Sequence, residues 1–176
     1  MRMIIIGSGP AGISAALYAR RAGAEVTVVS KGGGALASAE LVENYYGLSM
    51  PISGAELAHN GIDGARRLGV HFETDEVMAV LPMHDGRAFR IEGSCRTYEC
   101  DAVILAAGAR RKTLSIAGLA EFEGRGISYC AVCDAFFYRG KKVAVIGAGD
   151  YALHEAEILR PHVAQLALLT HGEEPM

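Results

Sequence analysis

Apolar and polar positions in the first thirty residues follow a strand–helix–strand pattern. Residues 3–7 are a short apolar run that ends at a glycine, and residues 10–22 place Ile13 and Ala16 on one face of a predicted helix. Residues 25–30 are rich in β-branched side chains, which favours a second strand. With so short a crossover between them, these elements predict the start of a parallel α/β sheet.

The middle of the chain predicts a loop, a helix and several short strands. Residues 31–51 are rich in glycine and predict a loop. A helix is predicted over residues 53–68, because Ser53 and Glu56 form a capping-box pattern at its start. The sequence then favours a meander of three strands at residues 75–82, 87–92 and 96–100. A buried strand is predicted to follow at residues 101–107.

The last part of the chain repeats the opening pattern. A strand, a helix and a strand are predicted at residues 142–147, 150–160 and 164–170. We therefore expect an α/β fold with a Rossmann-like three-layer unit over residues 1–110. Residues 111–176 would begin a second Rossmann-like domain, incomplete because only one strand–helix–strand copy is present, as in a fragment or a chain completed by another chain.

Composition and charge exclude several classes of function. The chain has 176 residues, of which 51% are hydrophobic, so it has ample material for a core. Its net charge of −3 argues against a nucleic-acid surface. The first apolar run is too short for a signal peptide, and no apolar stretch approaches the ~18 residues of a membrane span. We expect a cytoplasmic protein.

A glycine-rich turn joins the first strand to the helix, with the sequence Gly7-Ser8-Gly9-Pro10-Ala11-Gly12. This is the context that a dinucleotide-binding fingerprint requires. Gly7 allows the tight turn, Gly9 lets backbone amides approach a pyrophosphate, and Gly12 lets the helix pack against the strand. The proline suits the first helical turn. The second strand ends on Ser30, where an acid commonly binds the ribose hydroxyls.

A second turn of the same kind lies between the later strand and helix, with the sequence Gly147-Ala148-Gly149-Asp150-Tyr151-Ala152. Alanine replaces its last glycine, which still permits close packing. Gly147, Gly149 and Ala152 are therefore candidates for nucleotide binding.

The cysteines suggest redox chemistry. Cys130 and Cys133 are separated by two residues and can form a small disulfide or half of a metal site. The adjacent Asp134 can move a proton to and from a departing thiolate. We expect the pair to lie at the start of a helix, where the helix dipole lowers the pKa of a thiol. A zinc site would also need Cys95 and Cys100, and a purely structural disulfide is a third possibility. Core packing is the other expected role of Cys100.

These motifs, in this order, resemble the low-molecular-weight thioredoxin reductases over essentially the whole chain. The first glycine-rich turn resembles the FAD fingerprint of that family. The run Gly33-Gly34-Ala35-Leu36 through residues 42–47 is similar to its flavin-contacting loop, with Ala35 where the family usually has Gln. The turn at residues 106–109 resembles its Ala-Thr-Gly-Ala turn, and residues 128–134 closely resemble its redox centre. The resemblance thus adds further candidates for FAD binding: Gly34, Leu36, Asn44, Ala107 and Gly108.

The resemblance implies roles for the residues of the redox centre. Cys133 would lie nearest the flavin and accept its electrons, Cys130 would attack the partner's disulfide, and Asp134 would donate a proton. It also implies a homodimer, a thioredoxin-like dithiol protein as partner, and a final FAD-binding segment that returns after the nucleotide domain.

The second nucleotide site departs from the family pattern. Tyr151 stands where members that use NADPH carry a small residue, and residues 170–174 read Thr-His-Gly-Glu-Glu where they carry His-Arg-Arg. Without two guanidinium groups to bind the 2′-phosphate, we expect NADH or ferredoxin as the electron donor in place of NADPH. The alternative is that Lys141 or Arg160 supplies the missing charge.

Three functions remain open from the sequence. The first is a flavin-dependent disulfide reductase, and the second is a flavoprotein dithiol oxidase of the same family. The third is a non-catalytic fragment or a zinc-bound interaction module.

Overall fold

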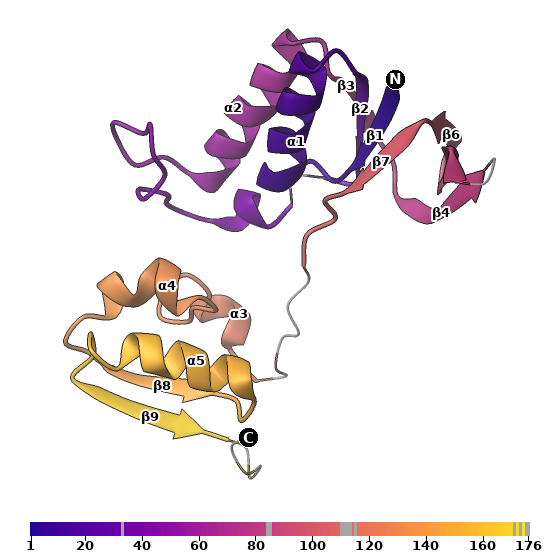
Figure 1. Ribbon diagram of the computed structural model, residues 1–176. Helices are drawn as coiled ribbons and strands as arrows, with labels where there is room; N and C mark the ends of the chain where they lie inside the picture. The colour runs from indigo at the N-terminus through magenta and orange to yellow at the C-terminus, as the bar shows by residue number, and fades with distance from the viewer. Residues whose placement is uncertain are drawn as a thin grey trace. The chain divides into compact units, whose positions relative to one another are not determined.

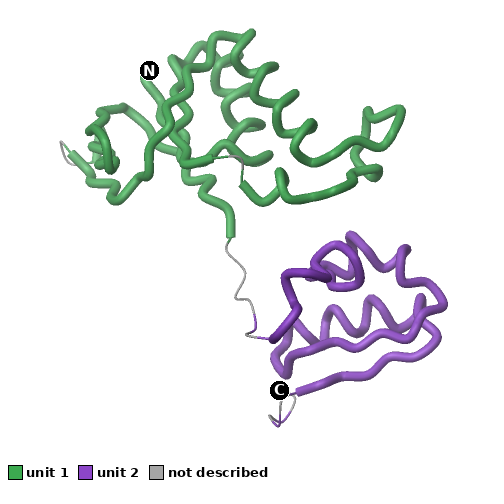
Figure 2. The backbone as a smooth tube through the Cα atoms, turned by 180° about the vertical axis from the view of Figure 1, so that it is seen from behind, with its two compact units in different colours: residues 1–112 green, residues 113–176 purple. Residues whose placement is uncertain are grey.

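A computed structural model of the chain describes residues 1–32, 34–83, 86–109, 114, 116–170, 172 and 174. The chain divides into two compact units, Met1–Lys112 and Thr113–Met176, which are coloured separately in Figure 2. No helix within the described part of the chain is long and apolar enough to cross a membrane.

Unit 1 is built on a parallel sheet with the strand order β3-β2-β1-β7. Its strands are β1 (Arg2–Ile6), β2 (Glu25–Ser30), β3 (His71–Thr74) and β7 (Ala102–Leu105). In the central register Ile4 pairs with Thr27 on one side and with Val103 on the other. The carboxyl ends of β1, β2 and β7 therefore meet at one edge, where ligands bind in open α/β sheets.

The two faces of this sheet are covered differently. Helices α1 (Pro10–Arg21) and α2 (Gly54–Arg67) lie together on one face (Figure 1), where Val28 is buried with Ile13 and Ala65. The antiparallel strands β4 (Val77–Met83), β5 (Ala88–Gly93) and β6 (Thr97–Cys100) pack on the other face, where Ile91 and Cys100 are buried with Ile4 and Val29 of the parallel sheet. Successive side chains of a strand point to opposite faces of the sheet, so Val28 is buried under the helices and Val29 under the antiparallel strands. The predicted three-layer α/β fold is confirmed.

Unit 2 repeats the opening strand–helix–strand arrangement, as the sequence predicted. Strands β8 (Lys142–Ile146) and β9 (Gln165–Leu169) are parallel and are connected by α5 (Asp150–Leu159). Three short helical segments precede them: α3 (Leu119–Phe122), α4 (Ala131–Asp134) and the 3-10 helix η3 (Ala135–Tyr138). Ala131, Ala135 and Leu159 form the buried core, so α4 is fixed against α5.

Two elements of unit 1 differ from the expectation. Strand β3 was not predicted, because its four residues are too few for alternation to identify a strand and it depends on pairing with β2. A 3-10 helix, η1 (Ala35–Ser38), lies inside the predicted loop, where its last turn packs against the start of α2. The other predicted helices and strands are present, with ends shifted by a few residues or less.

A buried carboxylate holds the meander together. Asp75 accepts hydrogen bonds from the hydroxyls of Ser94 and Tyr98, at 2.8 and 3.0 Å, and from the backbone amides of Glu76 and Cys95, at 2.8 and 3.0 Å. Burial raises the pKa of Asp75, but these hydrogen bonds outweigh it and hold the pKa well below its ordinary value. Burial, followed by the bond to Asp75, raises the pKa of Tyr98 to about 12.

Candidate functional site

The first glycine-rich turn has no room for side chains at two of its glycines. Gly7 has a φ of 112° and donates its amide to the carbonyl of Val29 at 2.9 Å, which fixes the turn to β2. A Cβ added to Gly12 would lie 1.9 Å from the Gly7 carbonyl oxygen, so only glycine allows α1 to approach β1 this closely. This close approach is the packing that the dinucleotide fingerprint predicts.

The beginning of α1 is suited to an anionic ligand. Its N-cap is Gly9, which has no side chain to satisfy the free amides, and the first turn contains no acidic residue. A Cβ on Gly9 would meet no described atom within 4 Å, so open space faces the turn. The start of α2 differs, because there Ser53 accepts the amide hydrogen bond of Glu56 at 3.1 Å. The free backbone amides and the helix dipole at the start of α1 are therefore suited to bind a pyrophosphate.

Several other candidates for FAD binding lie near this turn. A Cβ on Gly34 would lie 3.8 Å from the Gly9 Cα, and the backbone nitrogen of Ala107 is 3.3 Å from where a Cβ on Gly7 would lie. Ser30 ends β2 at the same edge, and Gly108 follows Ala107 with a φ of 74°.

Two candidates lie farther along the chain. Leu36 is half-buried in η1, and Asn44 is exposed in the loop closed by the bridge between Val42 and Ile52. Gly33 is outside the described residues.

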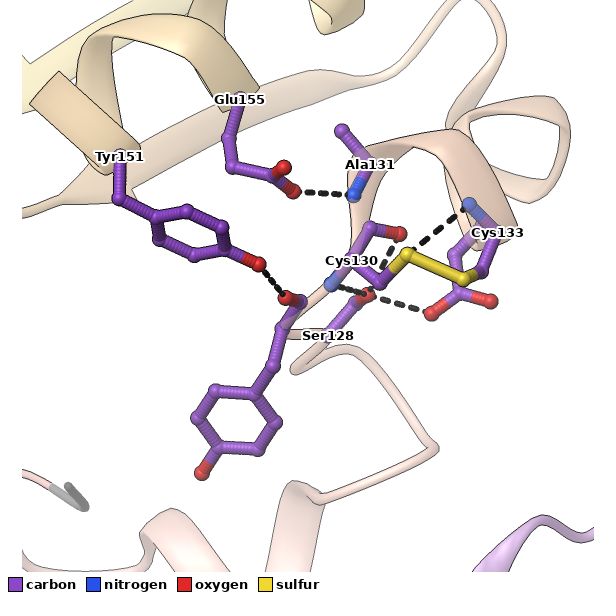
Figure 3. Close-up of a disulfide and its surroundings, with 8 residues drawn as sticks. Ser128, Cys130, Ala131, Cys133, Tyr151 and Glu155 are labelled. Atoms are coloured by element: carbon purple, nitrogen blue, oxygen red, sulfur yellow. Dashed lines mark hydrogen bonds between the residues drawn. A yellow bond between two sulfur atoms is a disulfide. The ribbon is translucent and has the colours of Figure 1, made fainter. Parts of the chain in front are cut away.

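Unit 2 contains the cysteine pair of the predicted redox centre. Cys130 and Cys133 form a disulfide (Figure 3), and Cys130 is the N-cap of α4, where its sulfur accepts the amide hydrogen bond of Cys133 at 3.2 Å. The prediction that the pair lies at a helix start is confirmed. Cys130 is half-buried, whereas Cys133 is exposed. Helix amides pointing at a sulfur favour its thiolate form.

The zinc hypothesis finds little support in the described part of the chain. No cluster of three or more His, Cys, Asp or Glu side chains is placed there to hold a metal. Cys100 is fully buried in the unit 1 core, where burial raises the pKa of its thiol. Its core-packing role is therefore the one that the structure supports.

A polar network surrounds the disulfide. The Ser128 hydroxyl donates to the carboxylate of Asp134 and accepts the amide hydrogen bond of Cys130 at 3.1 Å. The carboxylate is thus connected to the backbone of residues 128–131, which we call the redox loop. Burial, and then the negative charge of Asp134, raises the pKa of the nearby Tyr138.

Helix α5 is connected to the same loop by two side chains. The hydroxyl of Tyr151 donates to the carbonyl of Tyr129 at 2.7 Å, and the carboxylate of Glu155 accepts from the amide of Ala131 (Figure 3). Both side chains, with Cys130, line a cavity of about 240 Å³ within unit 2.

A family model, pyridine nucleotide-disulphide oxidoreductase, matches residues 1–176. The chain belongs to this family. Thioredoxin reductase of Bacillus subtilis (strain 168) is 37% identical over 170 residues, which cover 95% of this chain and 52% of the relative. The chain spans about half the length of the curated relatives it matches.

Solved structures agree with this assignment. Thioredoxin reductase from Streptococcus pyogenes superposes with a TM-score of 0.90 at 33% identity, covering 98% of this chain and 56% of that chain. An atypical thioredoxin reductase from Desulfovibrio vulgaris Hildenborough gives a TM-score of 0.58 at 36% identity, covering 98% and 58%. The resemblance to thioredoxin reductases is confirmed.

In this member of the pyridine nucleotide-disulphide oxidoreductase family, the second glycine-rich turn has a different beginning. Gly147 has a φ of 147°, and a Cβ on it would lie 2.8 Å from the Ala152 Cβ, so the turn packs tightly. The N-cap is again a glycine, Gly149, but the first turn of α5 starts with an acid, Asp150. Tyr151 follows and is 65% exposed. Of the predicted donor-site run, residues 171 and 173 lie outside the described residues.

Sequence reasoning missed two residues of the site. Ser8 is buried and donates its hydroxyl to the carbonyl of Gly32 at 3.1 Å, which connects the first glycine-rich turn to the loop after β2. Glu155 was missed because its partner is a backbone amide 24 residues away. Neither bond leaves a local pattern in the sequence.

Proposed function

We propose that this chain is the FAD-binding and redox part of a flavin-dependent disulfide reductase that acts on thioredoxin or a similar dithiol protein. The observation that carries the proposal is the disulfide of Cys130 and Cys133 at the start of a helix, beside Asp134. A disulfide in this position, in a chain that also has a dinucleotide-type turn, is suited to electron transfer.

Unit 1 would hold FAD as the first FAD-binding segment, residues 1–110, and residues 111–176 would carry the redox centre. When bound, FAD would supply the electron pair. The amides at the start of α1 would bind its pyrophosphate, because Gly9 leaves them open. The residues proposed to contact the cofactor are Gly7, Gly9, Pro10, Ala11, Gly12, Ser30, Gly34, Leu36, Asn44, Ala107 and Gly108.

The chemistry at the cysteines balances as a thiol–disulfide exchange. Two electrons and two protons convert the disulfide of Cys130 and Cys133 to two thiols. The Cys130 thiolate then attacks the partner's disulfide, which forms a mixed disulfide and releases one partner thiolate. Attack by Cys133 on Cys130 restores the original disulfide and releases the partner as a dithiol. Asp134 would transfer protons to and from the sulfurs.

The test uses the full-length protein loaded with flavin. Its flavin is reduced without oxygen by light and a sacrificial electron donor such as EDTA, and oxidised thioredoxin is then added in the dark. We expect the flavin to be reoxidised with formation of an equal amount of reduced thioredoxin. Cys133→Ser should abolish this transfer, whereas Cys95→Ser, which changes an exposed free cysteine, should retain it. A flavin that stays reduced after oxidised thioredoxin is added would overturn the proposal, and oxygen consumption with a dithiol substrate would then favour the dithiol oxidase.

For the electron donor we propose NADH or ferredoxin in place of NADPH. Each charge-assisted contact to a 2′-phosphate contributes roughly 1.5–3 kcal/mol, and the stretch from Thr170 to Glu174 contains no arginine. Asp150 and Tyr151 place a carboxylate and an aromatic ring in the first turn of α5, where the pyrophosphate of either NADPH or NADH would lie, so they weigh against both nucleotides. NADPH, NADH and reduced ferredoxin should be compared on the full-length protein, and rapid reduction by micromolar NADPH would refute this choice.

We also propose that the complete protein is a cytoplasmic homodimer, as the family resemblance implies. Its mass in solution, measured by light scattering, should be twice that of the subunit.

A further inference from the structure

Two residues of α5 bind the backbone on either side of Cys130. The Tyr151 hydroxyl donates to the carbonyl of Tyr129, the residue before it, and the Glu155 carboxylate accepts from the amide of Ala131, the residue after it (Figure 3). Residues four apart share a face of a helix, so both side chains project from α5 toward the redox loop.

The contact made by Glu155 is held in place by packing. Ala131 is buried against Leu159, one helical turn beyond Glu155 on the same helix. Glu155 itself is half-buried. Its charge is therefore less screened than that of a carboxylate in open water, and its influence on a nearby group is larger.

This arrangement has an electrostatic consequence for the disulfide. The start of α4 favours negative charge on the Cys130 sulfur, which accepts the Cys133 amide. Glu155 places a carboxylate on the first amide of the same helix, so it opposes a thiolate at Cys130. Because the charge of Glu155 destabilises the reduced form of the pair, the dithiol gives up its electrons more readily and is a stronger reductant.

We propose that Glu155 is a positioning residue that fixes the Cys130 backbone and, through its charge, lowers the reduction potential of the Cys130–Cys133 pair. The inference rests on the proposed function, because it requires that the pair interconverts between dithiol and disulfide. A lower potential suits a centre that must pass electrons onward to a partner's disulfide.

Other ionisable groups around the pair stay unchanged in the test. They belong to the redox loop, α4, η3 and α5, and are Tyr129, Asp134, Tyr138 and Tyr151. Glu155→Gln removes only the carboxylate charge, since a glutamine oxygen can still accept from Ala131.

The experiment uses the 176-residue chain without flavin. Wild-type and Glu155→Gln chains are equilibrated without oxygen in mixtures of reduced and oxidised dithiothreitol, which supply or accept two electrons and two protons. Free thiols are then alkylated and counted by mass. The variant should be half reduced at a reduced-to-oxidised ratio about tenfold lower, which corresponds to about 30 mV.

Two further variants separate charge from structure. Glu157→Gln makes the same chemical change on an exposed part of the same helix, about 200° around its axis, and should leave the ratio unchanged. Glu155→Ala should shift the ratio like Glu155→Gln and also speed hydrogen exchange at the Ala131 amide. A titration of Glu155→Gln that coincides with wild type would overturn the inference alone. A pair that cannot be reversibly reduced in any variant would overturn the proposed function with it.

Discussion

The two glycine-rich turns of this protein share a backbone plan but begin their helices differently. Each follows a parallel strand, and each helix has a glycine N-cap in an extended conformation, Gly9 in unit 1 and Gly149 in unit 2. The first turn of α1 starts with Pro10 and has no acid, whereas α5 starts with Asp150 and Tyr151. The start of α1 therefore offers open space and no negative charge to an anion, whereas the start of α5 carries a carboxylate and a tyrosine that bonds the backbone of its own unit.

The difference concerns what each helix start presents to a ligand. In unit 2 the same helix face supplies Tyr151 and Glu155 to the backbone of the redox loop. The motif alone therefore predicts the backbone of both units, whereas the side chains in the first turn of each helix distinguish the two sites.

The largest expected effect concerns the close packing of the first turn. Gly12→Ala would place a methyl group 1.9 Å from the Gly7 carbonyl oxygen. We expect this overpacking to lower the free energy of unfolding of unit 1 by about 2–3 kcal/mol, measured by chemical denaturation. Gly9→Ala is the matched control, because its Cβ meets open space. Equal stability of the two variants would contradict the packing described for α1.

The second prediction concerns how the stability of unit 1 depends on pH. The hydrogen bonds to Asp75 lower its pKa in the folded protein, so its contribution to stability is present above the unfolded value of about 3.9. The contribution is lost as the pH falls below that value toward the folded pKa. Asp75→Asn should therefore lower the denaturation midpoint of unit 1 at neutral pH, and by less in acid. A constant difference across this pH range would count against the buried network.

A smaller effect is expected at the capped helix. Ser53→Ala removes the acceptor for the Glu56 amide and should cost about 1 kcal/mol of unfolding free energy. The proposed pyrophosphate site is the uncapped start of α1 and not the capped start of α2, so flavin binding by the full-length protein should be unchanged. Loss of flavin in this variant would show that the two helix starts are less distinct than the contacts indicate.

The smallest effect is expected where α5 meets the redox loop. Tyr151→Phe keeps the exposed ring and removes the hydrogen bond to the Tyr129 carbonyl, which we expect to cost about 0.5–1 kcal/mol. Hydrogen exchange should become faster in the redox loop and stay the same in β8. Unchanged exchange in the loop would mean that the hydroxyl contributes nothing to holding it.

Local patterns predicted much of this molecule. The turn from Gly7 to Gly12, the Ser53 cap and the cysteine pair at a helix start each depend on residues close in sequence, so periodicity and spacing were sufficient. Strand β3, the hydrogen bonds that Ser94 and Tyr98 donate to Asp75, and the contact of Glu155 with Ala131 depend on partners 19 to 44 residues away. Such partners are set by the tertiary fold, which no local pattern in one sequence reveals.

The central claim, that FAD in this protein exchanges electrons with Cys133, is tested most directly by the absorbance spectrum of the full-length, flavin-loaded Cys130→Ser variant. With its partner sulfur removed, Cys133 should remain as a thiolate beside the flavin and produce a broad band at wavelengths longer than those of the flavin itself. Cys95→Ser should show no such band, because that cysteine lies outside the redox centre. A Cys130→Ser spectrum identical to that of the wild type, or a protein that carries no flavin, would contradict the claim.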